Sequence, residues 1–155
     1  TLKNLTHRDD PDSGEYALSF EITRPNYLQP LRNSMSVLKA EFFSRDGVPA
    51  LTAPERKLPL KLLAIAFDDE AEFSLPPGMI PDELPGDTAF SSDYGSYKKT
   101  VIVSGSTVRI ARQVELRAGI VPSVEYESVR KFLSNIGKAD RASLVLRSFD
   151  DVGVQ

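Results

Sequence analysis

The sequence contains no cysteine, no tryptophan and a single histidine, His7. The absence of cysteine excludes disulfides, thiol nucleophiles and cysteine-based zinc sites. One histidine cannot form a histidine cluster for a metal, and no serine near it lies in a nucleophile-elbow pattern. Closely spaced glycines of the kind that cradle phosphates are also missing. We therefore predict no catalytic centre and no cofactor, and we expect His7 to be a surface or edge-strand residue.

Charge and hydrophobicity exclude two further classes of protein. The formal net charge of −3 argues against a nucleic-acid-binding protein, which is usually basic. No run of eighteen apolar residues exists, so no membrane insertion is predicted. The charges are unevenly distributed, because residues 62–97 hold eight acidic and no basic residues, whereas residues 98–147 hold ten basic and four acidic ones. Two interpretations stay open: a polar docking surface for a neighbouring domain or a second copy, or ordinary solvated faces.

Alternation of apolar and polar residues with a period of two, the signal of a β-strand, recurs along the chain. In residues 16–22 it places four large apolar side chains on one face of a strand, with residues 2–6 as a pairing strand. Further strands are expected at residues 35–43, 58–67, 72–75, 97–103 and 107–117, and residues 144–146 form a strand or a helix tail. A turn at residues 45–47 ends the strand at 35–43. Residues 78–93, rich in Pro, Asp and Ser, are expected to be an irregular loop.

Two elements near the C-terminal end have sharper signals. Residues 97–103 and 107–117 predict a hairpin that turns at Gly105, and Arg112 falls on its apolar parity, which suggests a bulge or an edge position. A helix is predicted at about residues 123–137, with Ser123 as the N-cap and Gly137 as the stop. Its apolar stripe consists of Tyr126, Val129, Phe132, Leu133 and Ile136.

Several short strands without alternating helices predict a mainly β protein, an antiparallel β-sandwich of immunoglobulin-like or related type with one short C-terminal α-helix. We expect a single domain and a single core over residues 1–147, followed by a frayed tail at residues 148–155. The sequence begins with Thr, and we expect the chain to be part of a longer protein.

Two kinds of ligand remain as alternatives. Acidic clusters at residues 9–12, 68–70 and 150–151 could supply oxygen ligands to Ca²⁺, although solvated turn residues are the default interpretation of such clusters. Four aromatic side chains beside loops could form a sugar platform: Tyr27, Phe90, Tyr94 and Tyr97. For Tyr97, as for Tyr126, packing in the core is the alternative. The alternative function is therefore that of a stand-alone sandwich that binds glycan or calcium.

The C-terminal half resembles a known bacterial family. The resemblance rests on Tyr94-Gly95-Ser96-Tyr97, Arg112-Gln113-Val114-Glu115-Leu116, Gly119-Ile120-Val121-Pro122, the helix segment 126–132, and Ala139-Asp140-Arg141-Ala142 before an apolar run. Earlier matching stretches are residues 55–59 and 73–78. In that family a transglutaminase-like core is followed by a C-terminal domain of unknown function, and residues 14–147 resemble that C-terminal domain.

The resemblance implies a non-catalytic role. The family's Cys-His-Asp chemistry lies in the upstream core, and no residue here matches that triad. The implied partner is the neighbouring transglutaminase-like domain of the same polypeptide, in a periplasmic or cell-surface setting. Arg56, Tyr94 and Arg112 are the candidate interaction residues, Arg56 because it could pair with an acidic loop or a neighbouring domain. Self-association is left open.

Overall fold

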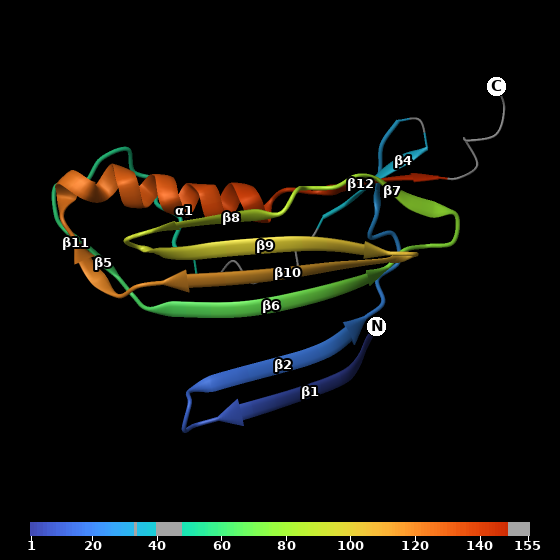
Figure 1. Ribbon diagram of the computed structural model, residues 1–155, viewed down its shortest axis with the longest axis horizontal. Helices are drawn as coiled ribbons and strands as arrows, with labels where there is room; N and C mark the ends of the chain where they lie inside the picture. Colours follow the sequence, from blue (N-terminus) through green and yellow to red (C-terminus); the bar gives the residue numbers. More distant parts are fainter. Residues whose placement is uncertain (33, 40–47, 149–155) are drawn as a thin grey trace.

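A computed structural model describes residues 1–32, 34–39 and 48–148. The protein is mostly β, with several antiparallel sheets and one helix near the C-terminal end (Figure 1), so the predicted fold class is confirmed. Within the described ranges no helix has both the length and the apolar character needed to cross a membrane.

The central sheet has four strands in the order β6, β10, β9, β8. Their bounds are β6 (Ile65–Ser74), β8 (Thr88–Ser92), β9 (Gly95–Ser104) and β10 (Thr107–Leu116). A second sheet has the order β3, β4, β12, β7, with β3 (Gln29–Pro30), β4 (Met35–Leu38), β7 (Met79–Glu83) and β12 (Leu144–Ser148).

Two smaller strand pairs complete the β structure. The N-terminal hairpin consists of β1 (Leu2–Asp10) and β2 (Glu15–Ile22), and the other pair consists of β5 (Leu60–Leu62) and β11 (Gly119–Val121). The helix α1 (Tyr126–Asp140) follows a 3-10 turn at Ser123–Glu125.

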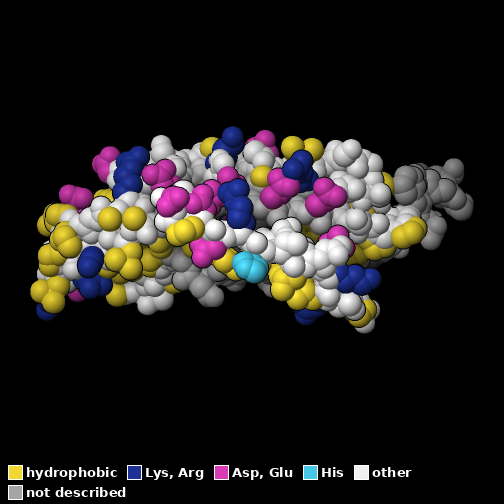
Figure 2. Space-filling model, turned by 90° about the horizontal axis from the view of Figure 1, so that it is seen from below, with side chains coloured by type: hydrophobic (Ala, Val, Ile, Leu, Met, Phe, Trp, Pro, Cys, Tyr) yellow, Lys and Arg dark blue, Asp and Glu magenta, His cyan; other side chains and the backbone are white. Residues whose placement is uncertain are grey.

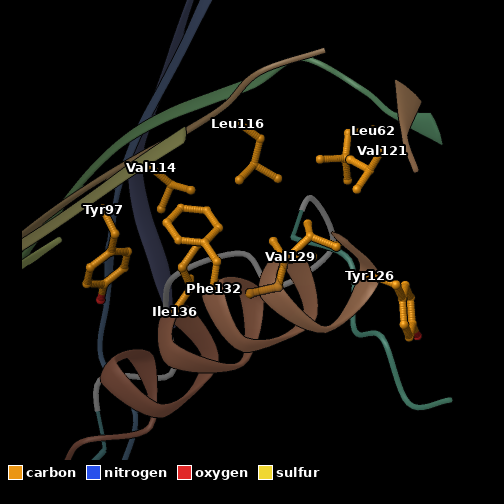
Figure 3. Packing of buried hydrophobic residues seen from close by; sticks show 10 residues of the cluster. Leu62, Tyr97, Val114, Leu116, Val121, Tyr126, Val129, Phe132 and Ile136 are labelled. Carbon is orange, nitrogen blue, oxygen red and sulfur yellow. The ribbon is translucent and has the colours of Figure 1, made fainter. Parts of the chain in front are cut away.

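One face of the central sheet carries the buried apolar residues, and two different elements cover it. At one end α1 packs on the sheet, and Figure 3 shows Val114 and Leu116 of β10 pointing towards Phe132 of the helix. At the other end Val108 and Ile110 of β10 pack with residues of β4 and β12, so there sheet packs on sheet. The five apolar residues of the predicted helix stripe are all buried, as expected. Each such side chain contributes roughly 1.5–3 kcal/mol when fully buried.

The expected strands at residues 58–67 and 72–75 are wrong in their bounds. The strand structure is interrupted between β5 and β6. From there β6 continues without interruption through the acidic stretch 68–72. This stretch fits a strand because its side chains alternate: Asp68, Glu70 and Glu72 are exposed, while Asp69 lies on the opposite, partly buried side. Among the described residues β6 pairs only with β10, so β6 is an edge strand.

The expected loop at residues 78–93 is also wrong, because β7 and β8 lie within it. Both are outer strands of their sheets, where one edge is unpaired and polar residues and proline are tolerated. Neither strand shows the apolar alternation of a central strand, because β7 begins with three consecutive apolar residues and β8 consists mostly of small and polar ones. Of the strand expected at 35–43, the structure shows β4; residues 40–47 and the tail at 149–155 lie outside the described residues.

Both ends of the helix differ from the prediction. Ser123 is not the N-cap of the α-helix, because it begins the 3-10 turn that precedes α1, and the N-cap of α1 is Glu125, which makes no side-chain capping bond. Gly137 does not stop the helix, which continues to Asp140. A glycine inside a helix costs about 1 kcal/mol. We infer that the contacts of Asp140 with the sheet, described below, offset this cost.

The N-terminal hairpin stands apart from the central sheet (Figure 1). None of its residues belongs to either buried cluster. Tyr16, Leu18, Phe20 and Ile22 share one face, as predicted, yet all four are exposed.

Gly95, the first residue of β9, can be replaced only with distortion of the sheet. A Cβ at this position would lie 1.9 Å from the backbone oxygen of Glu115, and the backbone has φ +151°. We expect Gly95→Ala to lower the free energy of unfolding by about 3 kcal/mol or more, measured by urea denaturation. The matched control is Gly86→Ala, since no heavy atom lies within 4 Å of a Cβ there. Equal urea midpoints for the two variants would contradict the close approach.

Candidate functional site

The central feature of the interior is a wholly buried guanidinium, that of Arg112 on β10. Its Nε and Nη2 atoms donate to the two carboxylate oxygens of Asp140, each at 2.9 Å. Its Nη1 atom donates to Oδ2 of Asp69 at 2.7 Å. This arrangement joins β10, β6 and the last residue of α1 through charge-assisted hydrogen bonds, one pair of them bidentate.

The bulge or edge position expected at Arg112 is wrong. β10 is a central strand, and its register with both neighbours is continuous through Arg112, which lies opposite Asp69 on β6 and Lys99 on β9. A charged residue is tolerated on the apolar parity because two carboxylates meet it there. Burial alone would lower the pKa of Arg112, but the charge of Asp140 and the bonds to both carboxylates raise it overall, so the guanidinium stays protonated.

Two more buried polar side chains from β9 complete the cluster. The hydroxyl of Tyr97 donates to Oδ1 of Asp140 at 2.8 Å. Burial, followed by this bond, raises the pKa of Tyr97 above its ordinary value. The ammonium of Lys99 donates to the backbone oxygens of Ala139 at 2.9 Å and Ala142 at 3.5 Å. Burial lowers the pKa of Lys99.

This cluster acts as a brace between sheet and helix. Lys99 binds a carbonyl of the last helical turn and one just beyond it, where the helix dipole favours a cation. Arg112 and Tyr97 hold the Asp140 carboxylate from the sheet side. The charged groups are used in bonds to one another and to the backbone, so the geometry supports a structural role.

The uneven charge distribution has an explanation inside the sheet. The acidic strand β6 and the basic strand β10 are antiparallel neighbours. On the exposed face Arg109 donates to Glu70 at 2.7 Å and Gln113 donates to Asp68 at 3.2 Å. Part of both charge excesses is therefore matched within one molecule. A shallow polar hollow on this face is lined by Asp68, Lys98, Thr100, Ala111 and Gln113.

The three candidate interaction residues lie at separate places. Arg56 is exposed in the segment before β5, and its Nε donates to the backbone oxygen of Leu58 at 3.1 Å. The Tyr94 hydroxyl bonds to Oε2 of Glu125 at 3.3 Å, beside the start of the helix. Arg112 binds the helix at its other end, through Asp140. Burial, then Glu125, raises the pKa of Tyr94.

The aromatic residues considered as a sugar platform pack inward. Phe90 stacks on Tyr97 with ring centroids 5.1 Å apart, and Phe90 and Tyr94 contact Phe132 of the helix. Tyr27 packs against the cluster between the sheets, and its hydroxyl donates to the backbone oxygen of Lys39. The core alternative therefore describes Tyr97, and the other three residues also pack against the buried clusters.

The acidic clusters do not converge on a cation where the structure describes them. Asp69 and Glu70 are paired with arginines, and no group of three or more acidic or histidine side chains with metal-binding geometry occurs within residues 1–32, 34–39 and 48–148. Asp150 and Asp151 lie outside those ranges. His7 is exposed on β1, as expected for a surface residue.

Sequence reasoning missed an apolar surface at the β5–β11 end of the molecule. Figure 2 shows hydrophobic side chains gathered at this end, on the left. Four large aliphatic side chains of this region are exposed by 62–89%: Leu58, Leu63, Ile120 and Val124. We call them the end surface. The alternation pattern does not reveal this exposure. It shows which residues share a face of a strand, but not whether that face is covered.

Comparison with known proteins identifies relatives of this chain. Residues 34–146 match the family described as "Domain of Unknown Function with solved-structure structure (DUF3858)". The fold is similar to the crystal structure of "a putative protease" from Parabacteroides distasonis, with a TM-score of 0.63 and 17% sequence identity. That similarity covers 75% of this chain and 24% of the other chain, so this chain corresponds to about a quarter of its neighbour. No curated protein matches the chain.

Asp140→Ala tests the brace. It leaves the guanidinium of Arg112 buried with one carboxylate fewer, and we expect the free energy of unfolding to fall by about 3 kcal/mol or more. Urea denaturation measures the change. The matched control is Glu70→Ala, which removes the exposed ion pair with Arg109 on the same two strands and should leave the midpoint nearly unchanged. Similar midpoints for the two variants would refute a stabilising brace.

Tyr97 predicts a loss of stability in alkali. Because its folded pKa is raised, its contribution is complete below the ordinary tyrosine pKa of about 10 and declines as the pH rises above that value. We expect the urea midpoint of the wild type to fall between about pH 10 and pH 12 more steeply than that of Tyr97→Phe. Parallel pH profiles would show that Tyr97 is not the group responsible.

Proposed function

Because this chain belongs to the DUF3858 family of domains of unknown function, we propose that it is a non-catalytic accessory module of a longer bacterial protein. In this proposal the module packs against a transglutaminase-like core in the same polypeptide and orients it. The resemblance of residues 14–147 to the domain that follows such a core supports this assignment. An exported protein, in the periplasm or at the cell surface, is the setting that the resemblance implies.

The observation that carries the proposal is that large aliphatic side chains are exposed on the outer side of the β5–β11 end, beside the exposed Lys61 of β5. Leu62 and Val121 point inward and are buried in the helix-side cluster. Ile120 on the outer side is 67% exposed, and Leu63, directly after β5, is 62% exposed. The end surface is thus suited to an apolar partner surface, and exposed patches of this kind mark interaction sites.

The composition of the chain and the length of its structural neighbour support an accessory role. The chain contains no cysteine to serve as the nucleophile of the family's core chemistry, and its one histidine lies outside the matched residues 34–146. The neighbour called a protease has about three quarters of its chain outside the similarity. We assign any peptide chemistry to such additional segments, and we assign to this module the role of orienting the core.

The mass of the natural polypeptide is the first test. An antibody against this chain would be used to isolate the protein from source cells for mass spectrometry. We expect a polypeptide several times heavier than the 17.1 kDa of this chain, with peptides that include a cysteine and a histidine upstream. A species near 17 kDa, or peptide hydrolysis or cross-linking by the isolated chain, would overturn the proposal.

The end surface gives a second test. Ile120→Asp/Val124→Asp should leave the urea midpoint of the 155-residue chain nearly unchanged, because both side chains are largely exposed. In the longer polypeptide the same variant should lower the midpoint of the module, because a charge then enters an apolar contact. Ala89→Asp adds one charge on an exposed position of β8 and is the control. An equal effect of the double variant in both polypeptides would argue against contact at this surface.

A further inference from the structure

The N-terminal hairpin is amphipathic, and its apolar strip follows β2. Tyr16, Leu18, Phe20 and Ile22 occupy one face and are 40–61% exposed. The opposite face is polar: Arg8 pairs with Glu15 at 3.1 Å, and Glu21 accepts from the amide of Asn4 at 2.8 Å. The hairpin therefore has one face suited to solvent and one that is suited to burial but uncovered.

Among residues 1–32, 34–39 and 48–148, no buried cluster covers this exposed face. A two-stranded hairpin is at best marginally stable in water, since its ladder needs a packed face to offset the ordering of the chain. Neither buried cluster includes a hairpin residue, and β1 and β2 belong to neither of the two four-stranded sheets. The alternating sequence of β2, with four large apolar residues on one face, is that of a strand whose face is covered.

The position of the hairpin in the chain indicates what covers it. It lies outside the family match, which begins at residue 34. Its two ends are joined by backbone hydrogen bonds between Thr1 and Thr23, of 2.6 Å and 2.8 Å. A segment that precedes Thr1 would therefore lie beside Thr23, where the chain continues into the rest of the module. A domain attached there would be held next to the hairpin at high effective concentration.

We propose that the hairpin is a docking arm, which lays its apolar strip on an apolar β-sheet face of the neighbouring domain in the same polypeptide. This rests on the proposed function, because it needs that domain to exist. The arm is separate from the end surface, which comes from β5, β11 and the segments beside them. A hairpin that belongs structurally to its neighbour explains its apolar face, its absence from both clusters and its place outside the matched family.

Native-state amide hydrogen exchange tests the docking arm. In the 155-residue chain we expect the amides of β1 and β2 to exchange nearly as fast as those of an unfolded chain, while the amides of β9 and β10 are protected. In the longer natural polypeptide the hairpin amides should exchange at least about a hundredfold more slowly, because docking buries the strip.

Two matched variants test whether the slower exchange depends on the apolar strip of β2. Leu18→Thr/Phe20→Thr keeps good strand formers while removing apolar surface, and it should abolish the gain in protection in the longer polypeptide. Ala17→Thr/Ser19→Thr changes the polar face and should preserve it. Neither variant should move the urea midpoint of the 155-residue chain, since the hairpin adds nothing to the buried clusters.

The outcomes separate the two proposals. Fast exchange of the hairpin in a longer polypeptide that does contain a neighbouring domain would overturn the docking arm and leave the accessory role standing. A natural polypeptide near 17 kDa would overturn both. Concentration-dependent dimerisation of the 155-residue chain in sedimentation, abolished by Leu18→Thr/Phe20→Thr, would overturn the stated occupant, because a second copy would then cover the strip.

Discussion

The buried ion pair between Arg112 and Asp140 is the contact on which the arrangement of sheet and helix depends. It places a positive charge in the centre of the sheet and a negative charge at the end of α1, where each would be costly without the other. Tyr97 and Lys99 on β9 add bonds to the same helix end. The helix is therefore fixed along its length by apolar packing and at its last turn by bonds of defined geometry.

The elements that the sequence predicted correctly are those with a regular apolar period, including the N-terminal hairpin, whose apolar face is exposed. The hairpin of β9 and β10 alternates because one face meets the core, and the stripe of α1 repeats at helical spacing for the same reason. Both signals are local, because they depend on residues a few positions apart. The mainly antiparallel fold with one C-terminal helix followed from these signals.

The parts that escaped prediction depend on residues distant in the chain or on surfaces without partners. The carboxylates that stabilise Arg112 lie 28 and 43 residues away, so its sequence neighbours suggested an irregular strand. β7 and β8 are short edge strands without apolar alternation and were expected to be a loop. Among the candidate interaction residues, Arg112 and Tyr94 have partners on the helix side of the sheet. To predict the end surface and the hairpin strip, one would have to know which apolar side chains stay exposed in the folded chain.

The acidic face of β6 has a consequence for the behaviour of the protein in concentrated solution. No described residue pairs with the outer edge of this ten-residue strand, and such an edge is a template on which another chain could extend the sheet. Three carboxylates, those of Asp68, Glu70 and Glu72, stand exposed along this edge strand, and only part of their charge is balanced by β10. A second copy that approached edge to edge would bring the same three charges against them. The residues that pair the strand with its neighbour thus also oppose uncontrolled growth of the sheet.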